Sequence, residues 1–404
     1  MTQRPEVARA LQASAPHALV DTLREVLAEG YGALSVELLL ADYGATALAP
    51  FGAAGTAAAP IPVANSAEGR AFGSQQPRQR SRHGDVVEHH LPVTVRGERT
   101  GILTVRLPVE RSVPEAVDGL AQAAGLLGHE LVVAERDTDV YQRARRISRL
   151  TLAAEMQWQL LPARACSADE YAIGAHLEPA YDTHGDNYDW ASDADELTLA
   201  VTDGMGTGVD ASMLTHLAVN ALRNARRAGI SIEDQAALAD QALYAQYRGA
   251  AYVSTLLLCF DLATGRVQAV DAGSPQLWRL RGRTIERIEL EPQMPLGMFE
   301  ETHYKAQEFE VLPGDRLLIV SDGVYAAHSP QGEAYAERAL ARTLHAGRLL
   351  PAADVPRAVL RDLAAYRDAE SLDDSLVLCV DWFGRQGDRP AGPGQAAGTG
   401  DGAR

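Results

Sequence analysis

The chain has 404 residues, of which 46% are hydrophobic and 23% are charged, a composition typical of a globular protein long enough for two domains. Its formal net charge of −17 argues against nucleic acid or an anionic membrane as a partner, because phosphate binding depends on clustered Lys and Arg. The sequence has no membrane-spanning apolar run, no signal-peptide pattern and only 3 cysteines, so we expect a cytoplasmic protein without a disulfide framework.

Residues 1–132 read as an α/β unit. The patterns predict a helix near 17–29, a strand at 35–42, two strands at 86–95 and 100–108 joined by a short turn, and a second helix from 116. This order is compatible with a small sensor domain. The hairpin sequence HLPVTVRGERTGILTVRLP resembles the late strands of GAF domains. The resemblance implies a sensor domain, with room for a small-molecule ligand.

The next segment, 133–162, is predicted to be a helical linker. Its apolar residues recur every seven positions and end before Pro162: Val133, Val140, Ile147, Ala154 and Leu161. Such a seam suits a two-stranded coiled coil, through which the chain would form a homodimer. The alternative is one amphipathic helix packed on its own domain.

Residues 163–384 alternate apolar strands with paired helices. Strands are predicted over 170–180 and 196–203, then in a long run from 252 to 320, and finally from 375 to 383, while helices are predicted near 211–229, 232–248, 333–347 and 353–368. Clustered strands with paired helices indicate stacked antiparallel sheets with helices outside. Residues 385–404 are rich in Gly, Pro and Ala, and we expect them to be disordered.

Acidic residues stand where the strands of this region end or begin. Asp186 follows one strand, Asp203 and Asp322 each end an apolar strand before a glycine, and Asp373 and Asp374 open the last strand. Carboxylates brought together repel one another, so a shared site needs divalent cations. An oxygen-only ligand set selects Mg²⁺ or Mn²⁺ over zinc.

The order of these motifs resembles the PPM-type, metal-dependent serine/threonine phosphatases, in their SpoIIE-like bacterial branch. The resemblance covers roughly 150–383 and rests on QWQLLP at 157–162, GDNYD at 185–189, DGMGTG at 203–208, AGSP at 272–275, PLG at 295–297, PGD at 313–315, SDGV at 321–324 and DDS at 373–375. It implies the α+β class, with an α/β/β/α sandwich preceded by the GAF-like domain and the helical linker.

The resemblance also implies a site with two Mn²⁺ or Mg²⁺ ions. Asp186 would bind one ion directly or through water, and Asp203 would bridge both. The backbone carbonyl of Gly204 would ligate the first ion, while Asp322 and Asp373 would hold the second. A hydroxide bridging the ions would attack phosphorus in line, without a phosphoenzyme. Whether Asp373 or its neighbour is the ligand is left open.

One departure from the branch concerns the proton donor. His184 stands where the branch has glycine, and we hypothesise that it protonates the leaving oxygen. The alternative is that metal-bound water does so and that His184 is a solvated loop residue.

The resemblance implies a phosphatase acting on phosphoserine or phosphothreonine of a regulatory protein, of the anti-sigma-factor antagonist type, under control of the sensor domain. Two other hypotheses stay open. One is a catalytically silent scaffold that keeps the fold and signals by binding, and the other is a GAF-type ligand-binding protein whose C-terminal half is only structural.

Overall fold

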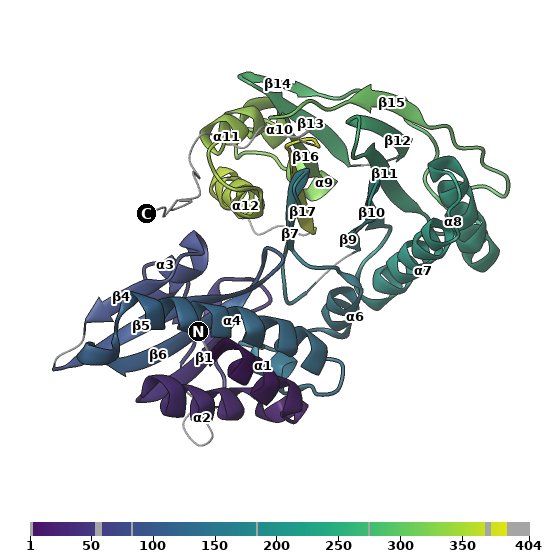
Figure 1. Cartoon of the computed structure of the whole chain (residues 1–404). Helices are drawn as coiled ribbons and strands as arrows, with labels where there is room; N and C mark the ends of the chain where they lie inside the picture. The colour runs from purple at the N-terminus through teal and green to yellow at the C-terminus, as the bar shows by residue number, and fades with distance from the viewer. Residues whose placement is uncertain are drawn as a thin grey trace, which may run out of the picture.

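The chain forms two α+β units joined by two short helices (Figure 1). The computed structural model describes residues 3–52, 59–81, 84–182, 185–273, 275–367 and 373–385. Residues 386–404, for which we predicted disorder, lie outside these ranges. No helix in the described ranges is both long and apolar enough to span a bilayer.

The N-terminal unit is built on one antiparallel sheet, whose described strands run in the order β3-β2-β1-β6-β5-β4. The elements are α1 (Gln3–Ala13), α2 (Leu19–Tyr31), β1 (Ser35–Ala41), β2 (Ala47–Pro50), β3 (Ile61–Pro62), α3 (Ala67–Ser74), β4 (Arg78–Ser81), β5 (Val86–Val95), β6 (Glu98–Pro108) and α4 (Pro114–Ala134). The predicted hairpin is confirmed as β5 and β6. Its turn places Arg96 and Gly97 at φ of 50° and 96°, which suits the twist of an antiparallel pair.

The two faces of this sheet are covered differently. Helices α1, α2 and α4 bury one face over an aliphatic core that includes Leu23, Leu38 and Leu127. Helix α3 covers the other face over a smaller core around Phe72 and Ile102. The fold agrees with the expected α/β unit, while its identity as a GAF domain stays a prediction.

The linker differs from the predicted continuous coiled-coil helix. After α4 ends at Ala134, the chain forms only α5 (Val140–Ala144) and α6 (Leu152–Leu160). Residues of the expected seam differ in solvent exposure. Val133 is 58% exposed and Ile147 is 39% exposed, whereas Ala154 is buried. The homodimer stays a prediction, but the continuous helical seam on which we based it is not formed.

Local chemistry explains these breaks. Asp and Thr side chains compete with helical hydrogen bonds and favour helix ends. The amide of Val140 donates to Thr138 Oγ1 at 3.4 Å, and Thr151 Oγ1 caps α6 by accepting from the amide of Ala154 at 3.2 Å. Tyr141 also anchors α5 to the N-terminal unit, where its hydroxyl donates to the carbonyl of Pro16 at 2.7 Å.

The second unit contains two antiparallel sheets with described orders β15-β12-β11-β10-β9 and β14-β13-β16-β17-β8-β7. Its strands are β7 (Ala165–Ser167), β8 (Tyr171–Glu178), β9 (Asp186–Ser192), β10 (Glu196–Gly204), β11 (Val253–Asp261), β12 (Arg266–Ala272), β13 (Gln276–Arg281), β14 (Thr284–Arg287), β15 (Gln307–Glu310), β16 (Arg316–Val320) and β17 (Ser375–Trp382). Its helices are α7 (Gly208–Arg227), α8 (Ile232–Tyr247), α9 (Asp322–Tyr325), α10 (Tyr335–Arg338), α11 (Leu340–Ala346) and α12 (Val355–Tyr366).

These elements stack as the predicted α/β/β/α sandwich. The inner faces of both sheets meet in one core, with Leu199, Phe260, Ile319 and Trp382 among its members. Helices α7 and α8 cover the outer face of one sheet, and α10, α11 and α12 cover the other (Figure 1). Each central strand is therefore buried on both faces, which accounts for its nearly continuous apolar sequence.

The two units also contact each other directly. The guanidinium of Arg99, on β6, donates to both carboxylate oxygens of Asp354 at 2.5 and 3.1 Å. The Tyr181 hydroxyl donates to Asp42 Oδ2 at 3.0 Å. Both of these contacts are made by charged or polar side chains, which are common between domains of one chain.

Candidate metal centre

Acids from both sheets converge at one end of the sandwich. Asp186 begins β9 and lies directly opposite Asp203 of β10 in the strand register. Asp322 opens α9 immediately after β16 in the other sheet. Carboxylate oxygens of these three residues lie within 4.8 Å of one another. The structure therefore brings together three of the acids singled out from the sequence.

Two glycines allow the backbones of β9 and β10 to approach closely. A Cβ on Gly185 would lie 2.3 Å from the carbonyl oxygen of Gly204, and a Cβ on Gly204 would lie 2.3 Å from Thr215 Oγ1. The amide of Gly204 donates to the carbonyl of Gly185 at 3.2 Å, and Thr215 donates to the same carbonyl at 2.8 Å. The glycines thus position the acids, whereas metal ligation by the Gly204 carbonyl stays a proposal.

Burial and mutual repulsion make these carboxylates hard to ionise. Burial, followed by the nearby charges of Asp203, Asp374 and Asp322, raises the pKa of Asp186 well above its ordinary value. Burial and the charges of Asp322, Asp373 and Asp374 raise the pKa of Asp203 to about 7. Burial and the charge of Asp373 also raise the pKa of Asp322. The folded protein holds a charge distribution that a cation would stabilise.

The adjacent pair Asp373 and Asp374 divides into two roles. Asp374 is 1% exposed, and its Oδ2 accepts from the amides of Gly185 and Asp186 at 3.0 and 3.3 Å. Asp373 is exposed, and its charge acts on Asp203 and Asp322. Asp374 therefore holds the backbone that carries Asp186, which favours Asp373 as the metal ligand.

The donor set fits divalent cations. Asp186 Oδ2 is buried, and it has no hydrogen-bond partner among the described residues. A buried carboxylate oxygen without a donor is costly, and a cation would satisfy it. Because the clustered ligands are all carboxylate oxygens, Mg²⁺ or Mn²⁺ suits them better than zinc.

Two supporting contacts were not apparent from the sequence. Gln157 of α6 is fully buried, and its side-chain amide donates to the backbone carbonyl of Asp186. Asp189 of β9 is paired with two arginines of α7, at 2.8 Å from Arg223 and 3.0 Å from Arg226. The second acid of the GDNYD motif therefore ties β9 to α7 and lies outside the carboxylate cluster. His184, the hypothesised acid, lies outside the described residues.

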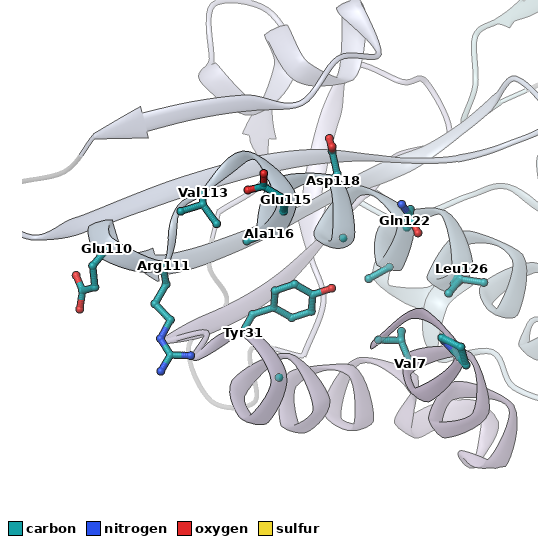
Figure 2. Close-up of a pocket in the computed structure, with 14 residues that line it drawn as sticks. Val7, Tyr31, Glu110, Arg111, Val113, Glu115, Ala116, Asp118, Gln122 and Leu126 are labelled. Carbon is teal, nitrogen blue, oxygen red and sulfur yellow. The ribbon is translucent and has the colours of Figure 1, made fainter. Parts of the chain in front are cut away.

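A sizeable cavity lies away from these acids. It has a volume of about 850 Å³ and lies in the N-terminal unit, between α4 and the helices α1 and α2. Figure 2 shows Tyr31 of α2 and Val7 of α1 below the α4 residues Asp118 and Gln122. This cavity therefore belongs to the N-terminal unit, and the metal centre is located by its cluster of carboxylates.

The chain is similar to several known proteins and solved domains. The chain is similar to phosphoserine phosphatase RsbU of Bacillus subtilis, with 20% identity over 73% of this chain and 88% of RsbU. Phosphoserine phosphatase RsbP of the same organism is 24% identical over 53% of this chain, which spans about half (53%) of RsbP. The solved PP2C domain of SiaA from Pseudomonas aeruginosa is 20% identical, with a TM-score of 0.48 over 57% of this chain and 94% of that domain.

The stacked sheets and the carboxylate cluster are the features that the sequence led us to expect of a metal-dependent phosphatase domain. Two of the similar proteins are named phosphoserine phosphatases. Residues 193–383 match the family model described as Stage II sporulation protein E. Asp203, Asp322 and Asp373 lie inside the matched segment, and Asp186 precedes it.

Proposed function

We propose that the chain is a metal-dependent phosphatase that hydrolyses phosphoserine or phosphothreonine on a partner regulatory protein of the anti-sigma-factor antagonist type. The observation that carries the proposal is the approach of Asp186, Asp203 and Asp322 to within 4.8 Å across two sheets. The names of RsbU and RsbP support the substrate class. Control by the N-terminal unit is part of the proposal, supported by the contacts between the two units.

In this proposal Asp186, Asp203, Asp322 and Asp373 hold two Mn²⁺ or Mg²⁺ ions, with the Gly204 carbonyl as a further ligand. When bound, the ions lower the pKa of water and offset negative charge on the phosphoryl oxygens, as direct attack on phosphorus requires. The residues of the chain hold the metal ligands in fixed positions.

Three contacts fix the ligand that begins β9. Asp374 binds the amides at Gly185 and Asp186, and Gln157 binds the Asp186 carbonyl. Thr215 binds the carbonyl of Gly185. Asp374 directly precedes β17, and Gln157 and Thr215 lie on α6 and α7, so a shift in any of these elements would move a metal ligand. Precise placement matters, since a displacement of about 1 Å can cost on the order of 100-fold in rate.

The scaffold hypothesis makes a different prediction about chemistry. A silent scaffold has no reason to retain a buried carboxylate oxygen without a donor, as found at Asp186. We propose to measure phosphate release from phosphoserine, phosphothreonine and phosphotyrosine peptides in Mn²⁺, using the full chain. We expect release from the first two and little from the third. Absence of release from every peptide and from p-nitrophenyl phosphate would favour the scaffold.

A further inference from the structure

A second cluster of metal-binding side chains lies in the N-terminal unit. Glu88 and His90 are two residues apart on β5 and share one face of the sheet, and Glu68 stands in the first turn of α3, which covers that face. One ligand atom from each of the three residues lies within 4.8 Å of the others. Both β5 side chains are only 1% exposed.

Neighbouring residues orient these side chains. Glu88 Oε2 accepts from Arg106 Nε at 2.7 Å, and His90 Nδ1 is hydrogen-bonded to Thr104 Oγ1 at 3.3 Å. Arg106 and Thr104 are the β6 partners of Glu88 and His90 in the strand register. Such outer contacts fix the orientation of an imidazole and a carboxylate that face a metal.

These contacts leave the remaining atoms facing each other. His90 Nε2 lies 3.7 Å from Glu88 Oε1, which is longer than a hydrogen bond. Two atoms bound to one ion through bonds of about 2.0–2.2 Å are separated by roughly 3–4 Å. The pair is therefore spaced as two ligands of one cation. The half-buried Glu68 offers a carboxylate oxygen within 4.8 Å of both atoms, and a change in the torsions of its flexible side chain can complete the set.

We propose that Glu68, Glu88 and His90 bind a divalent first-row transition cation, with Zn²⁺ as the reference ion. A mixed imidazole and carboxylate set selects such cations, in contrast to the all-oxygen cluster of the catalytic unit. Three protein ligands leave a coordination position for water or a small ligand. Through this site the N-terminal unit would respond to a metal ion separately from the catalytic unit.

The charge of the cluster supports a cation. Glu68 and Glu88 bring two carboxylates, and Arg106 donates to Oε2 of Glu88. Arg78 and Arg80 lie opposite His90 and Glu88 on β4, but their side chains are exposed to solvent, where their charges are screened. Two carboxylates beside an imidazole therefore favour a cation over an anionic ligand at this position.

The test is Zn²⁺ binding to the full chain carrying Asp203→Asn and Asp322→Asn, which weaken the catalytic centre. Calorimetry and metal analysis after gel filtration should find about one Zn²⁺ per chain. His90→Gln should weaken binding by at least ~100-fold. His89→Gln is the matched control, because His89 is equally buried but bonds to Ser112, and it should change affinity by less than ~3-fold.

A second variant keeps the test decisive if the His90 substitution impairs folding. Glu68→Gln changes a half-buried helix residue, and it should also weaken Zn²⁺ binding while leaving the circular dichroism spectrum unchanged. The proposal is overturned if the parent binds no Zn²⁺, or if Glu68→Gln binds it as tightly as the parent does. Phosphatase activity is not the readout, so failure here would leave the proposed function untouched.

Discussion

Replacing Asp203 by asparagine should stabilise the metal-free protein, and the gain should depend on pH. Burial and neighbouring acids raise the pKa of Asp203 from 3.8 to about 7 in the folded chain. Between these values the folded state binds more protons than the unfolded state, so the free energy of unfolding falls as the pH rises. From pH 5 to pH 7 this loss amounts to about 2–3 kcal/mol, at 1.36 kcal/mol for each pH unit. Asparagine cannot ionise, so the variant does not lose this stability as the pH rises.

Urea unfolding in EDTA at pH 5 and pH 8 measures this difference for the wild type and for Asp203→Asn. The advantage of the variant should grow by about 2–3 kcal/mol between the two pH values. Asp195→Asn is the control, because Asp195 precedes the same strand but its side chain is 83% exposed. An advantage of equal size at both pH values would refute the electrostatic reasoning.

Three further substitutions test the supports of the centre. Asp374→Asn replaces the acceptor of the Gly185 amide with a weaker one and should lower turnover about 10- to 100-fold with a higher Mn²⁺ requirement, as a Mn²⁺ titration of activity would show. Gly185→Ala would place a Cβ 2.3 Å from the Gly204 carbonyl and should lower the melting temperature and abolish turnover, measured by calorimetry and phosphate release. Arg223→Ala removes one partner of the buried Asp189 and should lower the free energy of urea unfolding by less than the about 3–5 kcal/mol of a fully unpaired buried charge, because Arg226 still pairs with Asp189.

The layers and the acids were predictable because each depends on local sequence. Apolar strands with paired helices indicated the sandwich, and an aspartate at the end of an apolar strand is visible without a structure. Asp186, Asp203 and Asp322 meet because the strands that carry them reach the same end of the sandwich.

The supporting contacts were not predictable, because they depend on partners distant in the chain. Asp189 resembles Asp186 in its motif, yet its partner is Arg223 of α7. Asp374 is adjacent to Asp373, and only the positions of the Gly185 and Asp186 amides distinguish them.

The continuous helix that we expected over the linker is interrupted for a related reason. A seven-residue repeat with Ala and Thr in its seam is weak, and local helix ends together with packing of Tyr141 outweighed it. Periodicity indicates a helical face, but it does not indicate which neighbour that face will contact.

The most direct test of the metal-dependent phosphatase is a Mn²⁺ titration of phosphate release from a phosphoserine peptide. The wild-type chain and Asp195→Asn should be inactive in EDTA and recover turnover with Mn²⁺. Asp203→Asn should stay at least ~1,000-fold less active at every Mn²⁺ concentration, as loss of a group essential to charge stabilisation implies. Turnover by the wild type in EDTA, or near-normal turnover by Asp203→Asn, would contradict the account.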